Sequence, residues 1–367
     1  MLTVMTPADM DRWNRIDHLG FGFTPTDDSA AAQPIVEHDR TLIASIDGVD
    51  VGVAGVITQQ LSLPGVGPRQ VAGVSTVAVV PTHRRRGVAR TLLQRLLEDV
   101  RARREEPIAV LWASDPGIYG RYGFGLAVRR VEAALAEIRP GIPVRDERWW
   151  ARTLHDDPGG RGGGSALRVF VVRDGSEPRA YALARTVMQW DGPIARGQVV
   201  VRETAALDVE AEQTLWGVMT GYDLMGEVNA WNLPVDDPLL WRLEDPRAAV
   251  PSLSDTLHVC VIDVPFALES RRYRGPVEVV LEVDDPFLDR GGRFRLVGDA
   301  LGARCEPTDD SPDLRLGVSE LSAAYLGGTA LEELALAGRV EELTPGALAP
   351  TAYAFSWHPK PWTPYVF

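Results

Sequence analysis

The sequence predicts an α/β (α+β) fold divided into three consecutive blocks over 367 residues. First, an apolar strand pattern, Val74–Val80, passes through a basic turn into residues with helical apolar spacing that end near Val100. Second, another series of strand patterns leads into a helix pattern over 209–219. Third, the pattern changes at Leu257, where short strands and helices follow in a different order. We therefore predict domains at 1–130, 131–256 and 257–367.

The first block opens with a predicted helix. Thr6, Pro7 and Asp9 supply a helix N-cap, a proline at the first helical position and a carboxylate at the third, which predicts a helix toward Leu19. Two runs of β-branched residues are joined across Asp47-Gly48, which favours a hairpin. The strands and helices predicted in this block are strands Thr41–Ile46, Val51–Leu61, Val74–Val80 and Ile108–Ala113, a helix from Val88 to Val100, and a short helix at Ile118–Tyr122.

The second block contains a glycine-rich stretch before its strands, Asp157–Ser165, which predicts an exposed loop. The elements predicted in the second block are strands Leu167–Val172, Tyr181–Val187 and Gln198–Thr204 and a helix from Val209 to Met219. Those predicted in the third block are strands at 258–262, Val277–Val283 and Arg293–Val297 and helices Pro265–Arg271, Ser319–Leu326 and Leu331–Leu336.

Composition and net charge argue against a membrane protein, a nucleic-acid-binding protein and a metalloprotein. No stretch approaches the ~18 consecutive apolar residues of a membrane span, and the N-terminus has no signal-peptide pattern, so we expect a cytoplasmic protein without a membrane partner. A net charge of −13 disfavours nucleic acid and favours a cationic small molecule. Cys260 and Cys305 have no cysteine or histidine cluster around them, so we expect two buried thiols and no metal site.

The turn Arg84–Ala89 carries the clearest chemistry. A helix N-terminus exposes unpaired N–H groups and partial positive charge, and Gly87 and Ala89 keep side chains away from a ligand. Arginines add fork-shaped hydrogen bonds to phosphate. A basic run alone is equally typical of a solvated helix start or a nucleic-acid patch. The apolar strand before the turn and the amphipathic helix after it favour a pyrophosphate site.

The spacing Arg-x-x-Gly-x-Ala in this turn resembles the coenzyme A signature of GNAT acetyltransferases. Three segments narrow the resemblance to the enhanced intracellular survival protein family: Val77–Gly87, Ala113–Gly125 and the terminal Phe367. The resemblance implies tandem GNAT folds with mixed sheets, a sterol carrier protein-like α+β domain at the C-terminus, and a homohexamer. It implies an acyltransferase that moves the acetyl group of acetyl-CoA to a primary amine. The second block lacks the arginine–glycine turn, so we expect it to bind no coenzyme A.

The resemblance also assigns the site residues. The strand backbone of Val77, Ala78 and Val79 would pair with the pantetheine arm, and Ser114 with Asp115 would add further cofactor contacts. Tyr119 would be the proton donor, with Tyr122 as its rival. The residues implied for the pyrophosphate are Arg85, Arg86, Gly87, Val88, Ala89 and Arg90.

Phe367 is implied as the base through its terminal carboxylate. A free α-carboxyl titrates near ~3.5 and an alkyl amine near ~10.4, so proton transfer between them requires a desolvated pocket. Asp27, Asp28 and Asp115 are the alternatives if the terminus is structural only. The sequence departs from aminoglycoside-acetylating relatives at Val366, where they carry a carboxylate. The acceptor amine, whether aminoglycoside-like, polyamine-like or a lysine side chain, stays open.

Two other function classes stay open as well. A lipid- or sterol-binding protein would use the third block, which should then contain a continuous apolar tunnel; Asp299, Arg304 and Asp309 interrupt the region that would line it. A regulatory protein that senses acetyl-CoA without turnover would keep the arginine turn but lack an acid and a base, which Tyr119 and Phe367 argue against.

Overall fold

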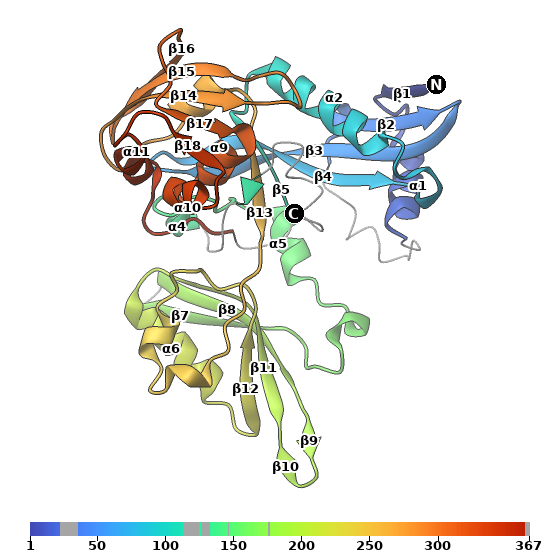
Figure 1. Ribbon diagram of the computed structural model, residues 1–367. Helices are drawn as coiled ribbons and strands as arrows, with labels where there is room; N and C mark the ends of the chain where they lie inside the picture. The colour runs from blue at the N-terminus through green and yellow to red at the C-terminus, as the bar shows by residue number, and fades with distance from the viewer. Residues whose placement is uncertain (23–35, 113–124, 127–132, 146, 175–176, 364–367) are drawn as a thin grey trace.

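The computed structural model describes residues 1–22, 36–112, 125–126, 133–145, 147–174 and 177–363. It is a mixed α/β structure with several sheets, as the sequence predicts. In Figure 1 the first and third blocks lie together, and the central block extends away from them. One hydrophobic cluster joins the first and third blocks, with Ala205 as its one buried member from the central block, whereas another cluster belongs to the central block alone.

A seven-stranded sheet organises the first block, with strand order β1-β2-β3-β4-β5-β13-β6. Asp47 and Gly48, both with positive φ, form the predicted hairpin turn between β2 and β3. The strands are β1 (Leu2–Met5), β2 (Thr41–Ile46), β3 (Val49–Leu63), β4 (Gly67–Val79), β5 (Ile108–Trp112), β6 (Gly125–Leu126) and β13 (Leu257–Val261).

Strand β13 differs from the sequence-based assignment, which placed residues 258–262 in the third block. It pairs antiparallel with β5 on one side and with β6 on the other, so it lies inside the first sheet. All five of its residues are buried. A continuous apolar run is typical of a strand covered on both faces, but it carries no information about which sheet the strand joins.

The first helix also begins later than predicted. Helix α1 spans Met10–Phe21, and its N-cap is Asp9, whose side chain accepts a hydrogen bond from the Arg12 amide at 2.7 Å. Asp9 therefore provides the cap that the sequence reading gave to Thr6. Strand β1, which was not predicted, occupies the chain before this helix and pairs with β2.

Two helices and the third block cover the first sheet. Helix α2 (Val88–Arg103) packs Leu92, Leu93 and Leu97 into a cluster with residues of β2–β5 and β13. Helix α1 packs Trp13 and Ile16 against another part of the sheet. The third block covers a further part through a cluster that joins residues of β3–β5 to its own core.

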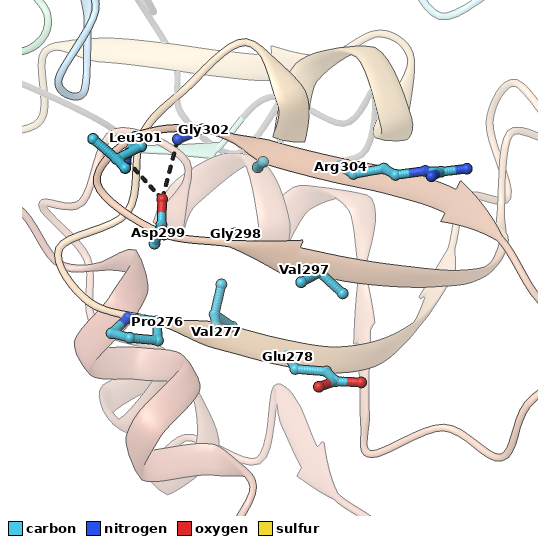
Figure 2. Close-up of a pocket in the computed structure, with 10 residues that line it drawn as sticks. Pro276, Val277, Glu278, Val297, Gly298, Asp299, Leu301, Gly302 and Arg304 are labelled. Atoms are coloured by element: carbon cyan, nitrogen blue, oxygen red, sulfur yellow. Dashed lines mark hydrogen bonds between the residues drawn. The ribbon is translucent and has the colours of Figure 1, made fainter.

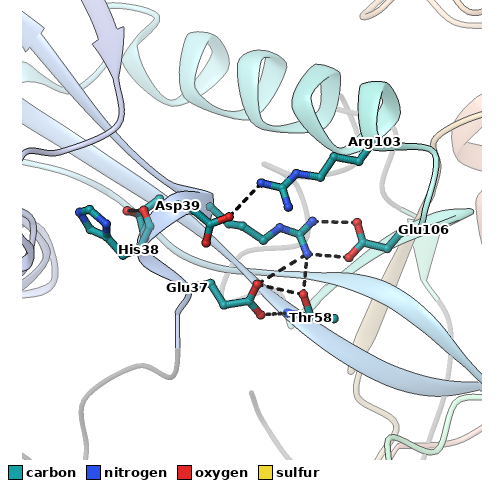
Figure 3. A network of polar contacts seen from close by, with 8 residues as sticks. Glu37, His38, Asp39, Thr58, Arg103 and Glu106 are labelled. Atoms are coloured by element: carbon teal, nitrogen blue, oxygen red, sulfur yellow. Dashed lines mark hydrogen bonds and ion pairs between the residues drawn. The ribbon is translucent and has the colours of Figure 1, made fainter.

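A buried ion pair ties the start of β2 to the start of β5 (Figure 3). The guanidinium of Arg40 donates to both carboxylate oxygens of Glu106, at 2.6 and 2.7 Å, and also to the Thr58 hydroxyl at 2.7 Å. The Glu106 side chain is fully buried. The pair therefore fixes the register of elements that are far apart in the sequence.

The central block has its own four-stranded sheet, with order β12-β11-β8-β7 and one packed helix. Its main elements are β7 (Arg168–Asp174), β8 (Glu177–Val187), β11 (Gly197–Ala206), α6 (Val209–Thr220) and β12 (Met225–Ala230). It also contains short helices α4 (Ala133–Ala136), α5 (Glu147–Leu154) and α7 (Leu239–Arg242) and a small ribbon of β9 (Trp190–Asp191) with β10 (Ile194–Ala195).

The third block is a five-stranded sheet with order β16-β15-β14-β17-β18 and four helices. Cys260 and Cys305 are both buried, as predicted, and burial raises their pKa values to about 11 and about 12. The elements are β14 (Val277–Asp284), β15 (Gly292–Gly298), β16 (Ala303–Pro307), β17 (Leu314–Gly317), β18 (Val340–Glu342), α8 (Val264–Glu269), α9 (Val318–Ala324), α10 (Leu331–Leu336) and α11 (Leu348–Phe355).

Candidate functional site

Strands β4 and β5 run side by side over only two residue pairs and then diverge toward the end of β4. Their parallel ladder contains only the pairs Ala72 with Ala109 and Gly73 with Val110. The ladder between β3 and β4 continues, in contrast, as far as the pair of Gly52 with Val79. Among the described residues, the last part of β4 therefore has a strand partner on one side only. Val77, Ala78 and Val79 lie in this part, where an extended ligand arm could pair with the backbone.

A β-bulge at Thr76 lies where the strands part. Between the pairs formed by Ser75 and Ala78, β4 has one residue more than β3. Thr76 has a φ of 54°, a left-handed conformation that β-branched residues rarely adopt, and its buried hydroxyl has no hydrogen-bond partner among the described residues. Strained bulges are over-represented beside active sites. The sequence gives no signal for this one, because threonine is not a residue that favours positive φ.

The turn after β4 leaves a helix N-terminus open. Gly87 is the N-cap of α2 with a φ of 80°, and no side chain caps the helix. Among the described residues, no side chain therefore caps the first-turn amides. A Cβ atom built on Gly87 would meet none of the described atoms within 4 Å, so the space beside Gly87 at the start of the helix is open in this part of the structure. This arrangement fits a phosphate group.

The four arginines of this turn have different roles. Arg84 donates from Nη2 to the Gly20 carbonyl at 3.1 Å and from Nε to the Val79 carbonyl at 3.3 Å, so it ties the turn to the end of α1. Arg85, Arg86 and Arg90 are exposed. They leave three cations beside the N-terminus of α2, and the predicted neighbours Val88 and Ala89 begin the helix itself.

Several predicted site residues lie outside the described residues: Ser114, Asp115, Tyr119, Tyr122, Asp27, Asp28 and Phe367. The structure does describe the chain that leads to Phe367. The Trp362 side chain is only 4% exposed and belongs to the cluster that contains Leu61 and Val110 of the first sheet, and Thr363 is fully buried. The approach to the C-terminus is therefore shielded from water, which a carboxylate base requires.

The central block presents a different helix N-terminus. The side chain of Asp208 caps α6 by accepting from the Ala211 amide at 2.8 Å, and Arg179 pairs with the same carboxylate. Strands β11 and β12 stay paired from Gly197 to Val201. Beyond Val201, β11 continues to Ala206 with β8 as its only partner among the described strands, so the strand pairing does not distinguish this block from the first. The Asp208 carboxylate, however, already occupies the place of an anion, and this supports the prediction that the block binds no coenzyme A.

Two surface hollows lie away from the turn. One of about 670 Å³ lies at one end of β14–β16, where Glu278 and Arg304 contribute to its lining and Asp299 accepts from the amides of Leu301 and Gly302 (Figure 2). Another of about 280 Å³ lies beside the C-terminal half of α2 and includes Arg103. Neither includes a residue of the Arg84–Ala89 turn.

Family models match all three blocks. Residues 2–127 and 141–259 each match an acetyltransferase (GNAT) domain, and residues 264–364 match a sterol carrier protein domain. GNAT domains use acetyl-CoA. Together with the parted strands and the open helix N-terminus, these matches define an acyltransferase of the GNAT class that carries a sterol carrier protein domain.

Relatives narrow the class to a family. The chain is 37% identical over 373 residues to an uncharacterized N-acetyltransferase of Streptomyces avermitilis, with 91% of each chain covered. It is 32% identical to the N-acetyltransferase Eis of Mycobacterium tuberculosis, with 79% of each covered. The crystal structure of Eis1 from Mycobacterium abscessus superposes with a TM-score of 0.82 and 27% identity, covering 100% of both chains. The chain belongs to the enhanced intracellular survival (Eis) family and is an N-acetyltransferase.

Proposed function

We propose that this enzyme transfers the acetyl group of acetyl-CoA to a primary amine of a small cationic molecule, aminoglycoside- or polyamine-like, or to a lysine side chain. The observation that carries the proposal is the parting of β4 from β5 directly before the uncapped N-terminus of α2. An extended pantetheine arm fits along Val77–Val79, and a pyrophosphate fits before Gly87 with Arg85, Arg86 and Arg90 around it. Ser114 and Asp115 complete the proposed cofactor contacts.

The proposed chemistry is direct attack of the amine on the thioester. The amine nitrogen bonds to the acetyl carbon, and the oxyanion that forms is stabilised by backbone N–H groups. The C–S bond then breaks, Tyr119 donates a proton to the departing thiolate, and the proton of the acylated nitrogen passes to the carboxylate of Phe367. Burial of Trp362 and Thr363 supports a desolvated terminus.

Assembly and location are separate proposals. We expect a homohexamer because of the likeness to the enhanced intracellular survival family, and sedimentation equilibrium of the purified chain tests it. Cytoplasmic location is tested by cell fractionation. Among the described residues, no helix has the length and apolar character needed to cross a membrane.

Lipid or sterol binding is disfavoured by the packing of the third block. Its interior contains the fully buried guanidinium of Arg271, which lies 4.8 Å from the Tyr273 ring centroid and 4.9 Å from that of Phe355. Arg271 also donates to the carbonyls of Tyr325 and Phe355. A buried charge satisfied in this way occupies the volume that an apolar tunnel would need.

The deciding experiment is a thiol-release assay with acetyl-CoA over a panel of polyamines, aminoglycosides and lysine peptides. We expect turnover with at least one cationic amine and no acceleration with neutral analogues of the same size. Tight acetyl-CoA binding by calorimetry without thiol release for any acceptor would favour a sensor instead. Saturable binding of a fluorescent sterol or fatty acid by the folded protein, with no thiol release, would favour the lipid-binding alternative.

A further inference from the structure

The last described stretch of the chain, residues 357–363, is held by one ion pair from outside the third block. Arg139 donates from Nη1 to the carbonyl of Lys360 at 2.9 Å and to Oδ1 of Asp236 at 2.8 Å. Oδ2 of Asp236 accepts from the Lys360 amide at 2.8 Å. Both backbone groups of Lys360 are therefore bonded to the same pair, which we call the tail clamp (Arg139 with Asp236).

Neighbouring contacts extend the clamp toward the C-terminus. The Trp362 amide donates to the Pro140 carbonyl at 3.0 Å, and the Arg139 guanidinium lies 5.5 Å from the Trp362 ring centroid. The side chains of Arg139 and Asp236 are only 15% and 19% exposed. Charge-assisted hydrogen bonds with so little solvent are stronger and more directional than surface pairs. The clamp therefore fixes the backbone on either side of Lys360.

The distance from the clamp to the chain end is short. Four residues follow Thr363, so the terminal carboxylate lies within about 14 Å of Thr363 even if this segment is fully extended. The clamp thus fixes the backbone position from which the last residues, and with them the carboxylate, extend toward a substrate. A catalytic base must lie within hydrogen-bond distance, ~3 Å, of the proton that it accepts, so a small shift of this backbone position would lower the rate of catalysis.

We propose that Arg139 and Asp236 are positioning residues for the reaction, and that they act by holding the tail that carries the carboxylate of Phe367. The inference rests on the proposed role of Phe367 as base. It also gives the central block a part in catalysis, because Asp236 follows β12 of that block. Both residues of the clamp fall within residues 131–256, so the central block contributes by supplying the whole ion pair.

The chain offers a matched control for the clamp. Arg185 pairs with Asp156 at 3.0 Å within the central block, and their side chains are 13% and 15% exposed. Arg139→Gln and Arg185→Gln each remove one guanidinium from a carboxylate of similar burial. Only Arg139 bonds to the tail, and Asp156 keeps a second guanidinium partner in Arg161 when Arg185 is replaced. Any loss shared by the two variants reports general destabilisation, and a loss confined to Arg139→Gln reports the clamp.

Two measurements are made on both variants in the full-length enzyme. Timed carboxypeptidase digestion followed by intact mass reports how readily the terminal residues are released. Steady-state kinetics separates kcat from the KM for acetyl-CoA. We expect faster release in Arg139→Gln alone, with kcat lowered by about 10²-fold, as a displacement near 1 Å can cause, and KM near the wild-type value. Arg139→Lys, which keeps the charge, should recover part of kcat.

The outcomes separate this inference from the proposed function. If Arg139→Gln matches Arg185→Gln in both release and kcat, while a glycine added after Phe367 still abolishes turnover, the clamp inference is wrong and the base assignment stands. If the added glycine leaves kcat unchanged, the base assignment is wrong, and the catalytic role of the clamp is overturned with it. Asp236→Asn provides a second variant that tests the same pair from the other side.

Discussion

Arg84 donates from Nη2 to the carbonyl of Gly20 at 3.1 Å, joining the turn before α2 to the C-terminal end of α1. The first arginine of the run therefore holds the turn in place, whereas Arg85 and Arg86 are exposed and the Arg90 guanidinium lies 5.5 Å from the Phe287 ring centroid. A Cβ on Gly20 would lie 2.7 Å from the Cβ of Ala78, so α1 also packs closely on β4 at this point. Helix, strand and turn thus form one rigid support for the proposed phosphate site.

Gly87→Val should raise the KM for acetyl-CoA many-fold. Its side chain would enter the space beside Gly87 at the start of α2, where the proposed phosphate would lie, and valine at a φ of 80° would be strained. Gly48→Val is a matched control, because Gly48 has a φ of 82° and nothing within 4 Å of its built Cβ but lies in the β2–β3 turn. Calorimetric titration with acetyl-CoA checks this. Equal cofactor affinity in the two folded variants would remove the phosphate assignment.

Tyr119→Phe should lower kcat by about 10²-fold and spare cofactor affinity, because only the donated proton is lost. Tyr122→Phe is the paired variant, and we expect near wild-type turnover from it. Steady-state kinetics of the two enzymes side by side decides between them. The reverse pattern would transfer the role of acid to Tyr122.

Extension of the chain beyond Phe367 should abolish turnover, although a tag on an exposed terminus is ordinarily harmless. The extension converts the carboxylate into an amide that cannot accept a proton. Phe367→Ala keeps a terminal carboxylate and should be milder, whereas deletion of Phe367 displaces the carboxylate by ~3.5 Å and should be severe. Thiol release by the three variants checks the order. A tagged, folded and fully active enzyme would place the base among Asp27, Asp28 and Asp115.

Asp17 should make the stability of the enzyme depend on pH. It lies on the buried face of α1, 6% exposed, and burial raises its pKa from 3.8 to about 6. The folded state therefore binds the proton more tightly than the unfolded state, and this contribution is present below pH 4 and lost as pH rises through 6. The loss is about 3 kcal/mol for a shift of this size.

Asp17→Asn should remove this dependence, so its advantage over the wild type in urea unfolding should grow from near zero at pH 4 to its full size by pH 7. Asp11→Asn, at an exposed position of the same helix, is the control for replacing a carboxylate on α1 by an amide. A constant difference between Asp17→Asn and the wild type across this range would contradict a buried ionised carboxyl at this position.

Elements with a strong local pattern were predictable. Helix α10 has the predicted bounds, and α2 and the Asp47-Gly48 hairpin follow from apolar spacing and turn residues. Relationships between distant residues were not. Nothing local indicates that β13 joins β5, or that Arg139 meets Lys360, because these contacts depend on how the blocks pack. The bulge at Thr76 was missed for another reason: the tertiary structure imposes a conformation that the residue itself disfavours.

The position of β13 constrains the order in which this protein can fold while it is being synthesised. Strand β6 has β13 as its only neighbour in the described sheet, so a nascent chain that has emerged only through residue 130 cannot incorporate β6. The ribosome must first produce the whole central block, a delay of about 10 s at ordinary elongation rates. During that interval β5 presents an open edge, which is a site for misassembly or chaperone capture. An isolated N-terminal fragment should therefore aggregate unless residues 257–261 are supplied.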